Sequence, residues 1–545
     1  MAVCEEDEMF LQTAFEGYVL PLDRFKRWVT CFCVVTFDLE LGQALELVYP
    51  THIELTDREK TNICYLAFPD SNSGCMGDTQ FHFRIRCSPR SCQKSQFVRR
   101  CEDEVPVAYR SDPAHFYGLA YFRQVKDPSL PRGYFQKSVV LISRLPYVNL
   151  FSEVLRITLK NGELSLEAVC HDIDQWPYPE AGHTLQLSTY GQCITGVRIP
   201  SRGDKPGAPQ MPSPKVIPTL KDPDIFRCLQ PILPHIHLLW ELVLTNEPII
   251  VMAPSPTVCS ETVQALARPF FTIHDTEFKE YTTRTQAPPG VILGVTNPFF
   301  AKNAATLAAH VVSSRRSPVI GHNPKKTLSS KPGIYTKYKQ LLAKDKLIFR
   351  RLSKGNHPKR PPEVQNAILR RHMVELTQSF MIPLERYVAS LMPLQKSISP
   401  WKRPPRLRPF DAEEFLTTLE HSGPQLTSRL KGNWVALYRK FFKSANFEGW
   451  LRQRRQEIRQ KLELLHLEAL GKADVSLWIK DKEEVEKVDL FLQIKEKLAG
   501  SVSFYPPVDH DVKQQLKSSP NNHNKQSSRG FAVCFEEQLT NGMRI

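Results

Sequence analysis

The runs Pro248-Ile-Ile-Val-Met-Ala253 and Val291-Ile-Leu-Gly-Val295 decide the fold of the middle of this chain. Each is a short apolar run bounded by proline, glycine or asparagine, a pattern typical of strands buried on both faces, although a turn of buried helix has the same periodicity. Between them, Ser255 and Pro256 provide a serine cap and a first-turn proline for a helix over 258–267. Strand, helix and strand form the unit of an α/β domain.

Upstream of this unit, residues 27–200 alternate between strand and helix patterns. A capping box at Thr56-Asp-Arg-Glu59 begins one helix, and Phe81 to Cys87 alternates apolar and polar residues as a half-buried strand does. The sequence predicts an α+β unit with an antiparallel sheet. Its predicted strands are 28–37, 44–49, 81–87, 115–125 and 136–145, and its second helix is 149–159.

Downstream, the chain becomes helical from Pro362. One periodic run covers 364–390 and is broken at Ile382-Pro383, because proline removes a hydrogen bond from a helix interior. Further helices are predicted over 411–420, 425–443 and 450–470, with another near 485–492. The fold class is therefore mixed α/β: an antiparallel α+β part, an α/β core and an all-α bundle.

Composition narrows the classes of protein to which the chain can belong. Its 545 residues include thirteen cysteines without the spacing of zinc ligands, which predicts free buried thiols in a reducing compartment. The acidic N-terminus lacks the pattern of a signal peptide, and no apolar run approaches the ~18 residues of a membrane span. We expect a cytoplasmic protein that meets membranes only at their surface or through partners.

The net charge of +15 is concentrated in one segment. Residues 321–371 hold fourteen lysines and arginines against Asp345 and Glu363. Three interpretations stay open from the residues alone: a solvated basic linker, a surface for an anionic membrane or acidic partner, and a nucleic-acid site with interleaved aromatic residues.

No enzyme active site emerges from motifs or spacing. The sequence has no G-x-x-x-x-G-K-[ST], G-x-G-x-x-G or G-x-S-x-G motif. His235 and His237 lie in an apolar helix pattern with their rings about 200° apart, so they are predicted as ordinary polar or capping histidines rather than metal ligands. We therefore predict no catalytic residue, no bound metal and no cofactor.

Over roughly residues 27–495, the chain resembles the DENN domain-containing protein 6 family, whose module has upstream, core and downstream parts. The runs that carry the resemblance are Arg27-Trp-Val-Thr-Cys-Phe-Cys-Val-Val-Thr-Phe-Asp38, Arg132-Gly-Tyr-Phe-Gln-Lys-Ser-Val-Val-Leu-Ile-Ser143, Trp240-Glu-Leu to Met252-Ala-Pro-Ser-Pro256, Tyr281-Thr-Thr-Arg-Thr-Gln-Ala-Pro-Pro289, and Leu376-Thr-Gln-Ser-Phe to Ser397-Ile-Ser-Pro-Trp401.

The resemblance implies a guanine-nucleotide exchange factor for a Rab GTPase, recruited to recycling endosomes, which docks the Rab across a longin-like lobe and a second lobe. It implies peripheral contact with the endosomal membrane and no nucleic-acid partner. The alternative is an adaptor that binds a Rab or a membrane without exchanging nucleotide. Candidate Rab contacts are Thr283, Arg284, Gln286 and Asn297; the other interpretation is that they cap helices and turns.

The resemblance also divides the chain. The predicted parts are a flexible tail over 1–26, an upstream longin-like domain over 27–200, a linker over 201–222, a shortened α/β core domain over 223–320, a basic linker over 321–361, a downstream helical domain over 362–497, and an atypical, disordered tail over 498–545. Three stretches depart from the family pattern: a shortened connection after the helix at 258–267, residues 303–330, and everything after about Lys497.

Overall fold

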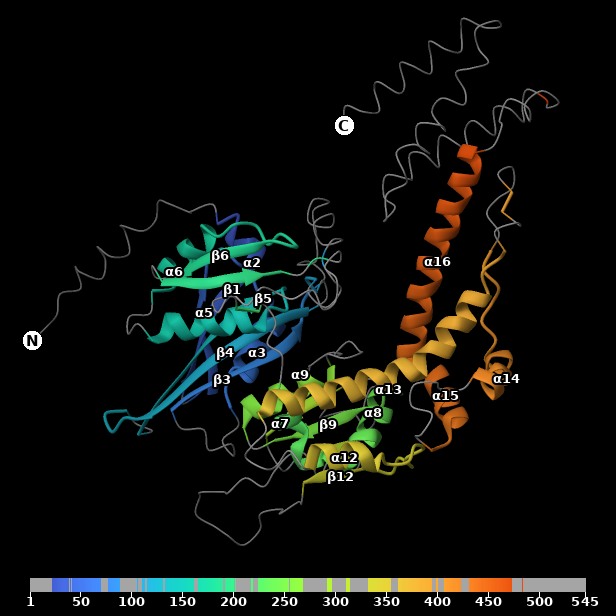
Figure 1. The fold of residues 1–545 in the computed structure, drawn as a ribbon. Helices are drawn as coiled ribbons and strands as arrows, with labels where there is room; N and C mark the ends of the chain where they lie inside the picture. The colour runs from blue at the N-terminus through green and yellow to red at the C-terminus, as the bar shows by residue number, and fades with distance from the viewer. Residues whose placement is uncertain are drawn as a thin grey trace, which may run out of the picture. The chain divides into compact units, whose positions relative to one another are not determined.

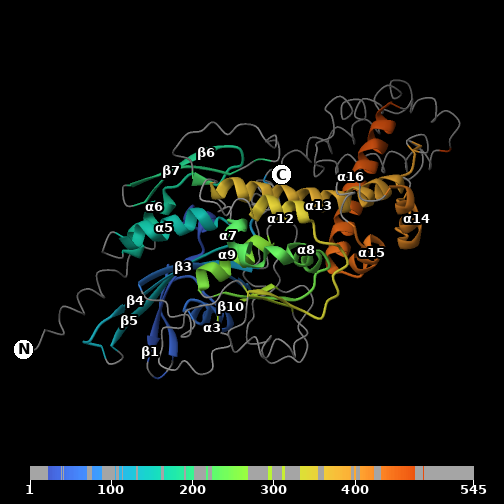
Figure 2. The same ribbon diagram turned by 60° about the horizontal axis from the view of Figure 1, so that its bottom comes forward.

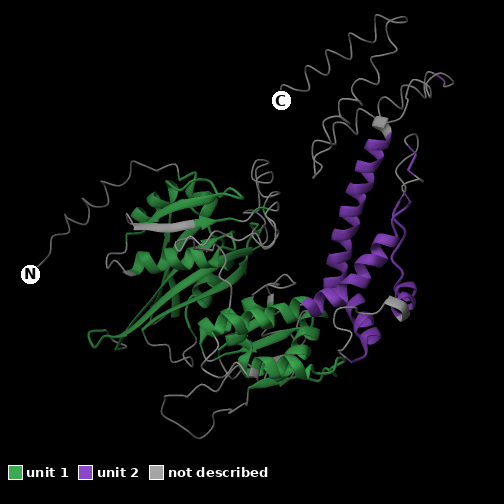
Figure 3. Ribbon diagram, viewed as in Figure 1, with its two compact units in different colours: residues 1–374 green, residues 375–545 purple. Residues whose placement is uncertain are grey.

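The computed structural model divides into two compact units, Met1–Val374 and Glu375–Ile545, shown in Figure 3. We refer to them as unit 1 and unit 2 and describe each by itself. The boundaries of the individual predicted domains stay predictions. The structure describes residues 22–38, 40, 42–69, 77–88, 105, 110–112, 115–130, 133–160, 165–189, 192–199, 201, 217–218, 224–253, 255–267, 292–296, 310–313, 332–353, 361–394, 398–399, 406–422, 431–472 and 483.

A five-stranded antiparallel sheet forms the first part of unit 1 (Figure 1). Its strand order is β2-β1-β5-β4-β3, so β2 and β3 are the edges. The antiparallel sheet predicted for this part is confirmed. The strands are β1 (Cys31–Asp38), β2 (Gly42–Tyr49), β3 (Gly77–Arg86), β4 (His115–Lys126) and β5 (Tyr134–Ser143).

Each face of this sheet packs against an apolar cluster. One strand contributes to both clusters, because its successive side chains point to opposite sides. On β1, Phe32 and Val34 join the apolar cluster of α5 (Val148–Lys160) and α6 (Leu166–Asp174). Cys31, Cys33 and Val35 join the opposite cluster, with Ile63 of α3 (Asp57–Leu66). The capping box predicted at Thr56 and Glu59 is present at the start of α3.

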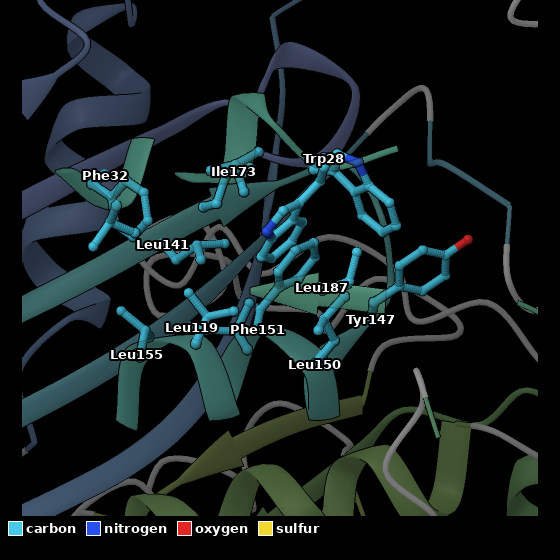
Figure 4. Packing of buried hydrophobic residues seen from close by; sticks show 14 of the residues in the cluster. Trp28, Phe32, Leu119, Leu141, Tyr147, Leu150, Phe151, Leu155, Ile173 and Leu187 are labelled. Carbon is cyan, nitrogen blue, oxygen red and sulfur yellow. The ribbon is translucent and has the colours of Figure 1, made fainter. Parts of the chain in front are cut away.

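Two tryptophans anchor the larger cluster (Figure 4). Trp28, which ends α2 (Phe25–Trp28), packs edge-on against Trp176 with ring centroids 5.4 Å apart. Their indole nitrogens donate to the carbonyl oxygens of Pro177 at 2.9 Å and Ser188 at 2.7 Å. Each buried indole N–H therefore has a partner, which removes the penalty for burying it.

A three-stranded sheet follows in the order β6-β7-β8. It consists of β6 (Thr184–Thr189), β7 (Gln192–Arg198) and β8 (Ile217–Pro218). Because β8 pairs with β7, the end of the predicted 201–222 linker is attached to the first part. Residues 202–216 lie outside the described residues.

The second part of unit 1 contains the α/β sheet, in the order β10-β9-β11-β12. β9 (Ile249–Met252) pairs in parallel with β10 (Ile292–Val295) and with β11 (His310–Ser313). α9 (Pro256–Ala267) follows β9, so the predicted strand, helix and strand are confirmed. Gly294 of β10 permits close packing, because a Cβ there would lie 2.6 Å from Cys259 Sγ.

The segment predicted as a basic linker over 321–361 is partly ordered. β12 (Gly333–Tyr335) pairs antiparallel with β11, and α12 (Lys346–Ser353) packs Ile348 and Leu352 into the α/β core. The interpretation as a solvated linker is wrong for 332–353, because Ile348 and Leu352 are spaced to face that core. The core is completed by α7 (Ile225–Leu229), η4 (Gln230–His235), α8 (Ile236–Leu244) and the first half of α13 (Pro362–Ser390).

Unit 2 is helical over its described residues. The predicted break at Pro383 is wrong, since α13 continues through this proline to Ser390. Buried Phe380 and Leu384 flank Pro383, so packing outweighs the hydrogen bond that proline removes. The predicted helix near 485–492 lies outside the described residues. The other helices are α14 (Ala412–Ser422), α15 (Trp434–Phe442) and α16 (Ala445–Lys472).

Stacked aromatic rings hold these helices together. Phe380 of α13 stacks on Tyr438 of α15 with centroids 4.1 Å apart, and the Tyr438 hydroxyl donates to the Phe380 carbonyl oxygen at 2.7 Å. Burial raises the pKa of Tyr438, so this phenol stays a donor. Within the described part of the whole chain, no helix is long and apolar enough to cross a membrane. Seven cysteines whose side chains the structure describes are free and buried, as predicted: Cys31, Cys33, Cys64, Cys87, Cys170, Cys228 and Cys259.

Candidate functional site

The four candidate contact residues lie outside the described residues. Thr283, Arg284 and Gln286 fall in 268–291, and Asn297 follows the end of β10 by two positions. Their contacts therefore stay predictions, and we characterise the described residues around them.

The carboxyl ends of the parallel strands define one edge of the α/β sheet. β9 ends at Met252, β10 at Val295 and β11 at Ser313, and parallel pairing brings these ends to the same side. α9 starts at this edge, where the Ser255 hydroxyl accepts from the Val258 N–H at 3.3 Å. In open α/β sheets, ligands bind beyond the carboxyl ends of the strands.

The same end of α9 contacts the antiparallel sheet (Figure 2). The Thr257 hydroxyl donates to the Gln80 carbonyl oxygen on β3 at 2.7 Å. The Gln80 side chain in turn donates to the Ser152 carbonyl oxygen of α5 at 3.3 Å. Because β3 is an edge strand, α9 covers backbone groups that would otherwise be open. We call Gln80, Ser152, Ser255 and Thr257 the junction, since the two parts of unit 1 meet there.

A charged group lies two residues from the junction on β3. The Asp78 carboxylate accepts from Arg123 through two bonds, of 2.7 and 2.9 Å, and from the Tyr121 hydroxyl at 2.7 Å. The Arg123 guanidinium lowers the pKa of Asp78, and burial raises the pKa of Tyr121. The Asp78–Arg123 pair is exposed by about two-fifths, so it orients polar side chains more than it stabilises the fold.

A buried carboxylate attaches the basic segment to the α/β core. Glu241 of α8 is fully buried and accepts from the Leu341 N–H at 3.0 Å and the Leu342 N–H at 2.7 Å. A buried carboxylate is stable only when hydrogen-bonded in this way. The sequence did not predict this contact, because Glu241 is a single polar residue in an apolar helix pattern and its partners are about a hundred positions away.

His237, predicted as an ordinary polar histidine, is buried beside another imidazole. Its Nε2 lies 3.1 Å from Nε2 of His372 on α13, and its ring packs edge-on against Phe349 of α12. Burial and the His372 ring lower the pKa of His237 to about 4. In the described chain, no three metal-ligating side chains are grouped around an ion site. The lowered pKa keeps His237 neutral at neutral pH, so its contact with His372 is a hydrogen bond between ring nitrogens or a close packing of the two rings.

Known proteins align with this sequence over most of its length. Protein DENND6A of Mus musculus is 53% identical over 536 residues, covering 92% of this chain and 88% of the relative. Protein DENND6B of Homo sapiens is 52% identical over 533 residues, covering 91% of each chain. This chain belongs to the DENND6 family. A more distant member, the DENND6 homolog of Dictyostelium discoideum, is 29% identical over 592 residues, covering 90% of this chain and 80% of the relative.

A family model described as the DENND6 C-terminal domain matches residues 475–526. The expectation that the family pattern ends at about Lys497 is therefore wrong for 498–526. The alignment to the mouse relative spans 536 positions, more than the roughly 500 residues that 92% of this chain represents. The relative thus has residues that this chain lacks, although the predicted shortening after α9 concerns 268–291, which lie outside the described residues.

Proposed function

We propose that this chain is a guanine-nucleotide exchange factor for a Rab GTPase, cytoplasmic and recruited to recycling endosomes. Similarity to DENND6 proteins over more than nine-tenths of the chain carries the proposal. In this proposal the first part of unit 1 is the longin-like lobe. The α/β core and the downstream helices are the core and downstream parts of the DENN module.

The proposed activity requires binding and no covalent step by this chain. A Rab holds its nucleotide partly through switch loops that the phosphates and Mg²⁺ order. A partner that prefers the displaced switches weakens nucleotide binding by the same coupling energy. A thousandfold faster release requires about 4 kcal/mol of preferential stabilisation at the transition state. A protein surface of ordinary size can supply that amount.

The junction supports the place proposed for the Rab. The carboxyl edge of the parallel sheet and the β3 edge of the antiparallel sheet meet at the start of α9. A GTPase docked there would contact both parts of unit 1 together. The candidate residue Asn297 follows the end of β10 by two positions in the sequence and lies outside the described residues, so its contact with the Rab stays part of the proposal.

The test is the dependence of binding on the nucleotide state of the Rab. An exchange factor must bind nucleotide-free Rab more tightly than the GDP-bound form, because exchange is driven by that difference. We expect at least a hundredfold preference by titration calorimetry or interferometry, which corresponds to about 2.7 kcal/mol. Equal affinity for the nucleotide-free, GDP and GTP forms would favour the adaptor instead.

A further inference from the structure

Residues 332–353 carry many exposed positive charges on a described segment of unit 1. Six lysines and arginines in this segment are exposed, and Asp345 is the segment's single acidic residue. We call these six residues the basic surface. They are Lys337, Lys339, Lys344, Lys346, Arg350 and Arg351.

The segment 332–353 is packed and hydrogen-bonded to the α/β core. The Glu241 carboxylate binds the backbone amides of Leu341 and Leu342 between the two halves of the segment. Ile348 and Leu352, four positions apart on α12, pack into the core. The charges therefore occupy defined positions, unlike those of a solvated linker.

Nearby carboxylates leave the basic surface largely unneutralised. The Asp345 carboxylate accepts from the backbone amides of Leu347 and Ile348 at 2.8 and 3.4 Å, which caps α12. Glu241 is fully buried, and its carboxylate accepts from the Leu341 and Leu342 amides. Among the described residues, none of the six cations forms a salt bridge. The field of the surface is therefore directed to solvent.

Apolar side chains are exposed among these cations. Leu347 is 52% exposed, and residues three and four positions further along a helix share its face, which places Arg350 and Arg351 beside it. Tyr335 of β12, which belongs to the same segment, is 47% exposed. An aliphatic and an aromatic side chain between lysines and arginines suit the interface of a lipid bilayer, where the apolar groups enter the headgroup region.

We propose that the basic surface binds the anionic surface of a lipid bilayer and holds unit 1 against it. Anionic headgroups attract such segments at ~1 kcal/mol for each lysine or arginine near the surface. The exposed leucine favours a bilayer over nucleic acid, whose backbone would leave that side chain in water. The inference deepens the proposed work at membranes, on which it rests, by naming the surface that makes the contact.

The test is flotation of the full chain with vesicles at moderate salt. Wild-type protein should float with phosphatidylcholine vesicles that contain phosphatidylserine and remain at the bottom with phosphatidylcholine alone. The triple variant Lys346→Gln/Arg350→Gln/Arg351→Gln should bind the anionic vesicles about a hundredfold more weakly. Leu347→Ala should weaken binding several-fold while keeping every charge.

A matched control removes three charges elsewhere. Lys26, Lys60 and Lys126 are exposed lysines of the first part, and Lys26→Gln/Lys60→Gln/Lys126→Gln should lose no more than a few-fold in binding. Thermal melts should show all variants folded. Equal losses in the two triple variants, or binding of wild type to neutral vesicles as strong as to anionic ones, would overturn the proposal.

Two further measurements separate this inference from other accounts. Tighter binding of single-stranded RNA or DNA than of anionic vesicles at the same salt would replace the bilayer with nucleic acid. Exchange on a soluble Rab without vesicles should be unchanged in the α12 triple variant. Lost flotation selectivity with intact exchange contradicts only the surface, and flotation without any exchange contradicts only the proposed function.

Discussion

In unit 1, the segments that cover the antiparallel sheet and those that cover the parallel sheet are held in place by different kinds of contact. The antiparallel sheet is covered by helices of the same 22–199 region, and its two clusters consist of alternating apolar residues. The parallel sheet depends on distant segments that are attached through buried polar groups. Glu241 bonds Leu342 across 101 positions, and His237 meets His372 across 135. The stability of the first core should therefore depend mainly on the volume of its buried side chains. The stability of the second core should also depend on its buried hydrogen bonds and on pH.

The largest expected loss of stability comes from a substitution in the core of the antiparallel sheet. Trp28→Ala removes a fully buried indole that packs on Trp176, and should lower the free energy of unfolding by about 4 kcal/mol. Trp28→Phe, which keeps a ring but loses the bond to Pro177, should lose about half as much. Chemical denaturation of both variants measures this. A loss below ~1 kcal/mol in Trp28→Ala would show that this cluster is not the centre of the core.

The next effect concerns the carboxylate that holds the basic segment. Glu241→Ala leaves the Leu341 and Leu342 amides without their acceptor and should cost about 3 kcal/mol. Glu241→Gln keeps an acceptor oxygen and should cost about 1 kcal/mol. Hydrogen exchange at residues 341–353 should rise in the alanine variant before it rises on β1 or β5. Equal exchange in both variants would contradict the role of the acceptor.

The third effect is a pH dependence confined to the second core. The folded pKa of His237 is about 4, below the ordinary value of 6.5. Between these two values the unfolded chain binds more protons than the folded one. The contribution of His237 to the stability is therefore fully present above pH 6.5 and is lost as the pH falls toward 4. From about pH 7 to about pH 5 the loss should be about 2 kcal/mol. His237→Gln removes the titration, and a wild-type profile as flat as the variant's would contradict the assignment.

The smallest effect on stability lies at the junction between the two parts. Thr257→Val removes the hydroxyl bound to the Gln80 carbonyl and should cost about 1 kcal/mol, while Thr257→Ser should be nearly neutral. Exchange on a Rab should fall more in the valine variant than this loss of stability explains, since the proposed docking site spans both parts. Unchanged exchange would show that the junction does not position the GTPase.

Local patterns predicted most elements of this fold. The capping box at Thr56, the strand β3 and the strand, helix and strand around Ser255 each depend on neighbouring residues, and each was confirmed. The alternating burial predicted along β3 was wrong, since the polar Arg84 is buried beside Ile85. Pro383 was misread because its lost hydrogen bond is a local cost, whereas the packing of Phe380 and Leu384 that outweighs it is tertiary. The order within 332–353 was missed for the same reason.

The candidate site was less predictable than the fold. The Thr257–Gln80 and His237–His372 contacts each join residues more than a hundred positions apart, and a single sequence carries no signal for such pairs. The basic charge was visible in the sequence, but its attachment through Glu241 was not. The contacts of Thr283, Arg284, Gln286 and Asn297 with a Rab stay predictions.

The most direct measurement is release of fluorescent GDP from a full panel of Rab GTPases in the presence of the folded chain. The account predicts that one or a few Rabs lose GDP orders of magnitude faster, in proportion to the concentration of the chain, while the others are unaffected. Traces that remain at the intrinsic rate for every Rab, with protein shown to be folded by its thermal melt, would contradict it.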